Sequence, residues 1–191
     1  MTRLTQGTIV SFLADIFTRR GHEEYLGEQV TMSAHMLQGA HFAAAESQRE
    51  EIIAAALLHD IGHFTSEFGS FTMNDTEDRM HEEAGAKVLA GFFPSVVTDC
   101  VRHHVAAKRY LCAVDPKYFD DLSDASVHSL ALQGGPMSEA EVTAFEKLEN
   151  ARDIVQVRIY DDRGKVHGLE VPGFDHYRGM LQRVVDAHLA T

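Results

Sequence analysis

The sequence predicts one all-α domain. Apolar residues recur at helical spacing along most of the chain, and Gly and Pro residues stand where such helices would begin or end. The chain has 191 residues, 45% of them hydrophobic, which suits one sizeable core. We therefore expect a single helical bundle that spans residues 1–191.

The first half of the chain predicts four helices separated by polar breaks. The first of them has Gly21 as its C-cap. The third is rich in strong helix formers up to Leu58, so His59 and Asp60 should lie in its last turns. Residues 65–79 mix glycine with small polar residues and have no clear period, which favours a loop or a broken helix. The expected helices cover residues 9–20, about 31–45, from 50 to near Gly62, and 81–90.

The second half predicts four more helices. Pro94 stands where a helix can start, and Gly134, Gly135 and Pro136 together break the chain. Ser138 and Glu141 have the spacing of a capping box, which favours the start of a long helical stretch that ends near Asp161. The expected helices cover about 95–111, about 121–133, about 139–161 and about 174–189, with a small extended segment over 166–171.

Composition excludes several classes of partner. The formal net charge is −12, so we expect binding neither to nucleic acid nor to an anionic membrane surface. The longest apolar run, Ile52–Leu58, is far too short to cross a bilayer, and Asp15 interrupts the N-terminal segment that would otherwise resemble a signal peptide. Cys100 and Cys112 are too few for a disulfide framework, which favours a cytoplasmic location. The sequence predicts no particular oligomeric state.

Histidines are frequent, with 12 in the chain, and four of them fall on different predicted helices together with two acidic residues. Imidazole and carboxylate groups bind Fe, Mn or Zn, and one carboxylate can bridge two ions through its two oxygens. The absence of nearby thiolates argues against a structural zinc site. A bare His-Asp pair at a helix end is otherwise an ordinary structural feature. The candidate ligands are His35, His59, Asp60, His81, His104 and Asp161.

Two cationic residues share helix faces with these candidates. Lys108 lies one turn after His104, whereas His103 points about a quarter-turn away, so we expect His104 to face the site. Arg158 lies three residues before Asp161 and shares its face. Either cation could instead be a solvated side chain, but together they favour an anionic substrate group.

The ligand pattern resembles the H…HD…H…H…D arrangement of the HD superfamily, and longer strings narrow the resemblance. The segments YLGEQ (25–29), LLHDIGH (57–63), HVAAKRYL (104–111), LSDAS (122–126), LQGGPM (132–137) and VPGFDHYR (171–178) are similar to those of the PhnZ- and TmpB-like HD-domain mixed-valence diiron oxygenases, which cleave carbon–phosphorus bonds. This resemblance spans about residues 23–180. It implies an HD-domain helical bundle with a metal-binding core over about 23–165.

The resemblance also implies the chemistry. An Fe(II)/Fe(III) pair would bind a small 1-hydroxyphosphonate, and O2 would be the co-substrate for cleavage to a carboxylate and phosphate. His35, His59 and Asp161 would hold one iron, His81 and His104 the other, and Asp60 both. Tyr25 and Glu28 would form a lid in which the tyrosine occupies an iron position until substrate displaces it. By motif match, the phosphonate-binding residues would be His63, Lys108, Ser126 and Arg158.

The amine end of the substrate is open between a trimethylammonio group, which gives glycine betaine, and a primary amine, which gives glycine. A quaternary ammonium favours aromatic faces near negative charge. The segment 63–80 supplies such groups and could form this pocket, although its composition slightly favours core phenylalanines and solvated acids instead. We favour the trimethylated substrate. The candidate ammonium pocket consists of Phe64, Phe68, Phe71 and Asp75.

Two other functions use the same ligands. An HD phosphohydrolase would attack a phosphate ester with a metal-activated water. A non-catalytic HD domain would bind a phosphorylated ligand as a sensor, but the complete set of six candidate ligands disfavours this alternative.

Overall fold

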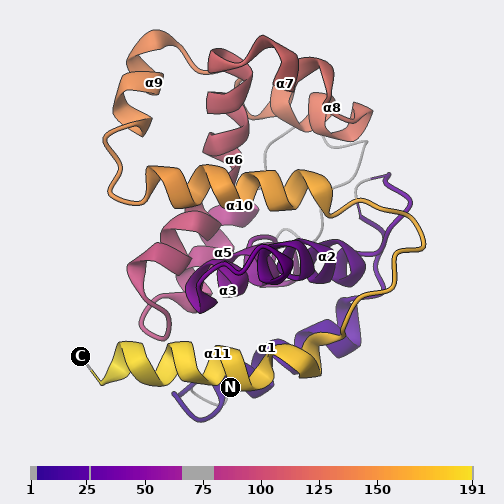
Figure 1. Cartoon of the computed structure of the whole chain (residues 1–191), viewed down its shortest axis with the longest axis vertical. Coiled ribbons are helices and arrows are strands. Elements are labelled where there is room, and N and C mark those ends of the chain that lie inside the picture. The colour runs from indigo at the N-terminus through magenta and orange to yellow at the C-terminus, as the bar shows by residue number, and fades with distance from the viewer. Residues whose placement is uncertain (1–3, 26, 66–79, 191) are drawn as a thin grey trace.

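The computed structural model describes residues 4–25, 27–65 and 80–190, and every regular element in these ranges is a helix (Figure 1). The predicted all-α class is confirmed. The helices are α1 (Ile9–Arg20), α2 (Met32–Ala45), α3 (Glu50–Leu58), α4 (Gly62–Thr65), α5 (His81–Leu89), α6 (Ser95–Val114), α7 (Pro116–Asp120), α8 (Asp124–Leu132), α9 (Glu139–Phe145), α10 (Ala151–Arg163) and α11 (Phe174–Leu189).

Helix α3 lies at the centre of the bundle, in contact with α2, α6, α10 and α11. After two glutamates in its first turn its sequence is wholly apolar, and six of its nine residues are buried, which is the pattern of a helix that lies mostly in the core. Helices α1 and α11 lie side by side at one end of the molecule, and α7, α8 and α9 lie at the other (Figure 1). The C-terminal end of α3 lies between these two ends, in the middle of the bundle.

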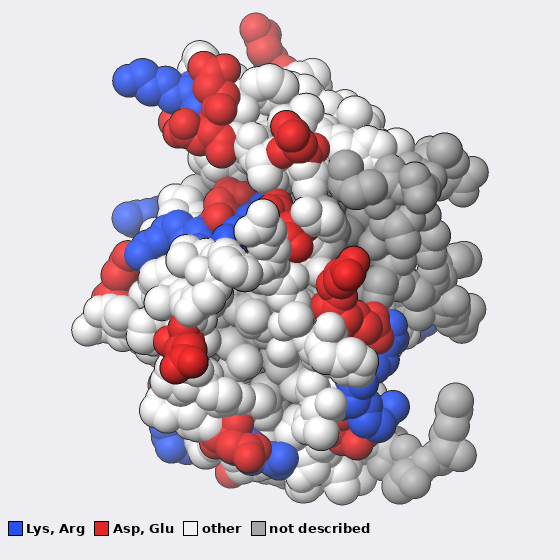
Figure 2. All heavy atoms as spheres, turned by 90° about the vertical axis from the view of Figure 1, so that its right-hand side faces the viewer, with Lys and Arg blue, Asp and Glu red and all other residues white. Residues whose placement is uncertain are grey.

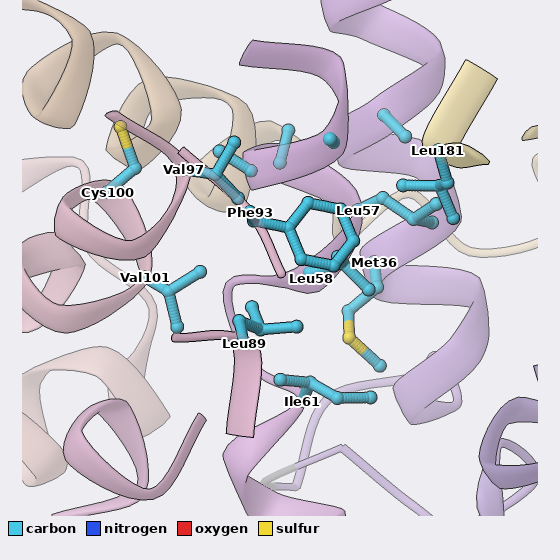
Figure 3. Packing of buried hydrophobic residues seen from close by; sticks show 14 of the residues in the cluster. Met36, Leu57, Leu58, Ile61, Leu89, Phe93, Val97, Cys100, Val101 and Leu181 are labelled. Atoms are coloured by element: carbon cyan, nitrogen blue, oxygen red, sulfur yellow. The ribbon is translucent and has the colours of Figure 1, made fainter. Parts of the chain in front are cut away.

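Large apolar side chains fix this central position. The Phe93 ring lies among Leu57, Leu58 and Leu89, so α3 and α5 share one core (Figure 3). Each such side chain contributes roughly 1.5–3 kcal/mol when fully buried. Cys100 is buried in the same cluster as a free thiol, as is expected of a small apolar side chain.

Local signals set several helix ends as predicted. Gly21 ends α1 and donates its backbone N–H to Phe17 O at 3.0 Å, and a Cβ at Gly21 would lie only 2.3 Å from that oxygen. The capping box of Ser138 and Glu141 is present at the start of α9. The last helix has the predicted bounds, 174–189.

The long helix predicted over about 139–161 is wrong, because the chain breaks between α9 and α10. Phe145, the last residue of α9, stacks on Tyr110 of α6 with ring centroids 4.7 Å apart. Asn150 donates its side-chain amide to Asp99 Oδ2 at 2.9 Å just before α10 begins. Both ends of the turn between α9 and α10 are thus held by α6. These tertiary contacts outweigh the local preference for one continuous helix.

The helix predicted over about 121–133 is present as α8, and an unpredicted short helix, α7, precedes it, because Asp115 caps α7 by accepting from Lys117 N. One other local prediction needs correction. The segment 166–171 is not a strand: both backbone polar groups of Val166 bond to the side chain of Gln38, at 2.8 and 2.9 Å. The Gln38 side chain thus occupies the backbone N–H and C=O of Val166, which would otherwise have to bond to a neighbouring strand.

The surface agrees with the acidic composition. On the face drawn in Figure 2, Lys and Arg side chains are interspersed with Asp and Glu and do not gather into a basic patch. Within the ranges that the structure describes, no helix combines the length and the apolar character needed to cross a membrane.

Candidate metal centre

The six predicted ligands converge in the middle of the bundle. They come from α2, α5, α6, α10 and the end of α3, where His59 is the C-cap residue. The predicted helix is therefore slightly too long, since His59 and Asp60 lie just beyond its last turn. The exposed fractions are 0% for His35 and His59, 2% for Asp60, His104 and Asp161, and 8% for His81.

Asp60 lies between two pairs of imidazoles. Its Oδ2 is 3.5 Å from His35 Nε2 and 3.4 Å from His59 Nε2. Its Oδ1 is 3.2 Å from His81 Nε2 and 3.3 Å from His104 Nε2. Each carboxylate oxygen thus faces one pair, which is the geometry of a bridge between two cations.

Backbone carbonyls orient three of the imidazoles. A carbonyl oxygen only accepts hydrogen bonds, so the Nδ1 atom beside it carries the proton and Nε2 points to the centre. Gly164 makes one of these contacts possible, because a Cβ there would lie 2.7 Å from the backbone oxygen of His35. The pairs are His35 Nδ1 with Gly164 O (3.0 Å), His59 Nδ1 with Ala56 O (2.9 Å) and His104 Nδ1 with Val101 O (2.8 Å).

The inward-facing nitrogens approach each other too closely to be left without a cation. The Nε2 atoms of His35 and His59 are 3.0 Å apart, and those of His81 and His104 are 3.1 Å apart. Two lone pairs at this distance repel unless a proton or a metal ion lies between them. The two ligand groups that share Asp60 each bring their donor atoms within 4.8 Å of one another, so the residues fit a metal ion in each group.

Asp161 completes the first group. Its Oδ2 accepts from Arg158 Nη1 at 2.7 Å, while its buried Oδ1 lies 3.3 Å from His35 Nε2 and has no hydrogen-bond partner within the described ranges. Burial by itself would raise the pKa of Asp161, but the Arg158 guanidinium and the nearby His59 hold it well below its ordinary value. The free oxygen is therefore ionised and directed at the centre.

Metal binding to this centre is expected to release a proton at pH 7. Burial disfavours the charged form of His59, but Asp60 and Asp161 outweigh it and raise the pKa of this imidazole to about 9 without metal. Because a metal ion takes the same Nε2 lone pair, affinity should rise by about tenfold per pH unit up to that pKa.

Calorimetric titration in two buffers of different ionisation enthalpy measures that proton. Affinity that is constant between pH 6.5 and 8.5, with no proton release, would contradict the prediction.

A small cavity with basic walls adjoins the centre. Lys108 is 3% exposed and donates its Nζ to Ser129 Oγ at 2.7 Å. Burial, reinforced by the charge of Arg158, lowers the pKa of Lys108 to about 7, so an incoming anion would be its natural partner. The predicted choice of His104 over His103 agrees with this geometry: His104 and Lys108 both line the cavity, and His103 is half-buried elsewhere.

His63 also lines this cavity. Its ring stacks on that of His81 with centroids 4.1 Å apart, and neither ring nitrogen has a hydrogen-bond partner among the residues that the structure describes. Gly62 allows this contact, because a Cβ there would lie 1.7 Å from His81 O. His63 therefore presents an unused polar edge beside Asp60, from which its Nε2 is 3.9 Å distant.

The predicted lid residues close the cavity on its other side. The Tyr25 ring stacks on that of His35, with centroids 3.9 Å apart and planes at 14°. Glu28 Oε1 accepts from Ser123 Oγ at 2.6 Å. Both side chains line the cavity, and the exchange of Tyr25 at an iron position stays a prediction.

Sequence reasoning missed three polar residues here. Lys165 donates its Nζ to Ser126 Oγ at 2.9 Å, and Ser129 and Gln133 also line the cavity. Ser129 lies one turn after Ser126, so its position on the same helix face was a usable signal. Lys165 follows the end of α10 and carries no periodic signal.

Most of the candidate ammonium pocket lies outside the described residues, so the pocket stays a prediction. Phe64 is buried in the apolar core, with its ring centroid 6.3 Å from that of Phe17 and 5.2 Å from Arg20 Cζ, and it does not line the cavity. Phe68, Phe71 and Asp75 lie outside the described residues.

The chain is similar to known proteins over nearly its whole length. The HD domain family matches residues 32–142, which contain five of the six candidate ligands. A [1-hydroxy-2-(trimethylamino)ethyl]phosphonate dioxygenase (glycine-betaine-forming) from Leisingera caerulea is 62% identical over 189 residues, 99% of this chain and 96% of the relative. A hydroxymethylphosphonate dioxygenase from Gimesia maris is 44% identical over 183 residues, 95% of this chain and 90% of the relative. The chain therefore belongs to the HD domain family and groups there with phosphonate dioxygenases.

Proposed function

We propose that this protein is an O2-dependent diiron oxygenase that converts 1-hydroxy-2-(trimethylammonio)ethylphosphonate to glycine betaine and phosphate. The observation that carries the proposal is the position of Asp60, with one oxygen on each pair of imidazoles, beside a cavity walled by Lys108 and Arg158. The 62% identity to the Leisingera caerulea enzyme supports the choice of substrate.

In this proposal His35, His59 and Asp161 would hold one iron, His81 and His104 would hold the other, and Asp60 would be a ligand of both. The bound iron pair would supply dioxygen activation and Lewis-acid sites for the substrate's oxygens. The overall reaction balances: one hydroxyphosphonate and one O2 give one carboxylate and one phosphate. The C1 carbon loses its hydrogen and its bond to phosphorus, and O2 accepts the four electrons.

The side chains around the iron pair would bind and orient the substrate. Lys108 and Arg158 neutralise the phosphonate charge, and the ring of His63, which has no hydrogen-bond partner in the described part of the chain, donates one N–H to a phosphonate oxygen. Ser126 adds a hydroxyl at the N-terminal turn of α8. Tyr25 covers His35 and limits access of water and O2 until the phosphonate is in place.

Oxygen dependence separates this function from phosphohydrolysis. Iron-loaded protein should release phosphate from the trimethylated hydroxyphosphonate in air and consume one O2 per phosphate. Under anaerobic conditions the rate should fall by about 100-fold or more, because O2 is a reactant. Equal rates with and without O2 would establish a hydrolase instead.

The substrate is tested with the same assay. The trimethylated compound should give the highest kcat/KM among three hydroxyphosphonates, the others being 2-amino-1-hydroxyethylphosphonate and hydroxymethylphosphonate. Mass spectrometry of the organic product should identify glycine betaine. A higher kcat/KM for the primary amine would assign the glycine-forming reaction.

A further inference from the structure

Gln38 of α2 binds the backbone of the segment that connects α10 to α11 (Figure 1). Its Nε2 donates to Val166 O at 2.8 Å, and its Oε1 accepts from Val166 N at 2.9 Å. Gln38 is 1% exposed, whereas the segment 164–173 has no helix or strand of its own. Within the described ranges, the other side chain that bonds to the backbone of this segment is His35. The amide therefore fixes an irregular segment to the helix that carries a candidate metal ligand.

The same segment supplies the carbonyl that orients His35. Its Nδ1 donates to Gly164 O at 3.0 Å, and the two residues are 129 positions apart in the chain. The two other imidazoles with a carbonyl partner, His59 and His104, bond to oxygens three residues earlier in the chain. A single helix end thus sets the orientation of each of those two rings. The orientation of His35 depends instead on where an irregular segment lies against α2.

This carbonyl selects one of two ring orientations of His35. The stacked Tyr25 ring fixes the plane of the imidazole, but half a turn about the Cβ–Cγ bond leaves that plane unchanged. Such a turn exchanges Nδ1 with Cδ2 and Nε2 with Cε1, so Nε2 would leave its place beside Asp60 and Asp161. A carbonyl beside Nδ1 favours the present orientation, because a ring C–H is a much weaker donor than N–H. The position of Gly164 O therefore decides whether His35 directs a lone pair at the centre.

Both ends of the short stretch that carries this carbonyl are held in place. Gly164 N donates to two carbonyl oxygens in the last turn of α10, each at 3.0 Å. Two residues later, Gln38 holds the backbone of Val166, a residue that is 46% exposed. Without the amide, water can take over both polar groups and this end can move outward. Lys165 also ties the stretch to Ser126, but through a long flexible side chain that fixes the backbone less closely.

We propose that Gln38 is a positioning residue for the first metal position, the one to which His35 belongs. By anchoring Val166 it keeps Gly164 O against His35 Nδ1, and so keeps His35 Nε2 directed at the metal. Gln38 lies three residues after His35, so both side chains leave the same face of α2 and meet the same segment. The inference rests on the ligand set of the proposed function and is independent of the reaction.

Gln38→Met tests this role, because methionine has a similar length and volume but forms neither hydrogen bond. Zinc-loaded protein is diamagnetic, so nitrogen–proton correlation spectra can detect the imidazole Nδ1–H groups, and His35→Ala identifies the signal of His35. In Gln38→Met this proton should exchange with water at least about tenfold faster, since its acceptor is no longer held in place. The Nδ1–H groups of His59 and His104 should exchange at their wild-type rates, because their acceptors do not depend on Gln38.

Zinc affinity gives a second readout that distinguishes the two metal positions. His104→Ala removes a ligand of the second position, and His35→Ala removes a ligand of the first. Combined with His104→Ala, Gln38→Met should lower zinc affinity by about tenfold, the lower end of what partners of metal ligands contribute. Combined with His35→Ala, it should lower the affinity by less than about twofold, because the residue through which it acts is already absent. A general loss of structure would lower both affinities alike.

Asn150→Leu is the matched control, since the Asn150 amide also bonds to another element, Asp99 of α6, at the opposite end of α10. It should leave the Nδ1–H signals and the zinc affinities at their wild-type values. If circular dichroism shows that Gln38→Met does not fold, Gln38→Glu, which keeps the acceptor for Val166 N, replaces it in the same comparison. Unchanged proton exchange at His35, or equal losses of zinc affinity in both backgrounds, would overturn the inference. If the wild type itself binds no metal ion, the proposed centre fails instead.

Discussion

Asp60→Asn is expected to remove metal from at least one of the two positions and to lower turnover on the order of 10³-fold, since metal-bound charge stabilisation is worth several kcal/mol. An amide has one oxygen where the carboxylate has two, so the substituted side chain could bind only one of the two metal ions. Its nitrogen would place N–H groups where a metal-directed lone pair now lies. Metal content per chain, from elemental analysis, and steady-state turnover measure the two effects.

The control for this substitution is Asp121→Asn, because Asp121 is exposed after α7. It makes the same change of charge at a side chain that does not line the cavity, and it should keep the wild-type metal content. Two bound metal ions and normal turnover in Asp60→Asn would rule out the bridging role.

Gly62→Ala is expected to destabilise the protein by about 3 kcal/mol or more, because a buried overlap with backbone exceeds the cost of ordinary overpacking. The added Cβ would lie 1.7 Å from His81 O and 2.8 Å from Gly85 N. Backbone atoms of α5 would have to move away from α4, and His81 would move with them. Chemical denaturation should therefore detect a lower free energy of unfolding, and metal content should fall.

Gly7→Ala is the comparison, because a Cβ at Gly7 would meet no atom within 4 Å. Its free energy of unfolding should differ from wild type by less than about 0.5 kcal/mol, as for most surface substitutions. If Gly62→Ala were as stable as Gly7→Ala and kept its metal, the close packing of α4 on α5 would have no energetic importance.

Features encoded within a few residues were predictable. Helix α11 has its predicted bounds because its apolar spacing and its flanking residues are local in the chain. His104 was distinguished from His103 by helical phase, since Lys108 lies one turn away on the same face. The break between α9 and α10 was not predictable in this way, because it depends on contacts of Phe145 and Asn150 with a helix about 40 residues earlier in the chain.

The candidate site likewise has features that were predictable from the sequence and features that were not. By itself, the sequence determined which residue types form the centre: imidazoles and carboxylates on separate helices, with His35, Asp60 and His104 among them. Only the tertiary structure decided that each oxygen of Asp60 faces one imidazole pair, and that Lys165 meets Glu28 across the cavity. The reason is physical: helical period fixes which side chains share a face, whereas distances between faces follow from how the helices pack.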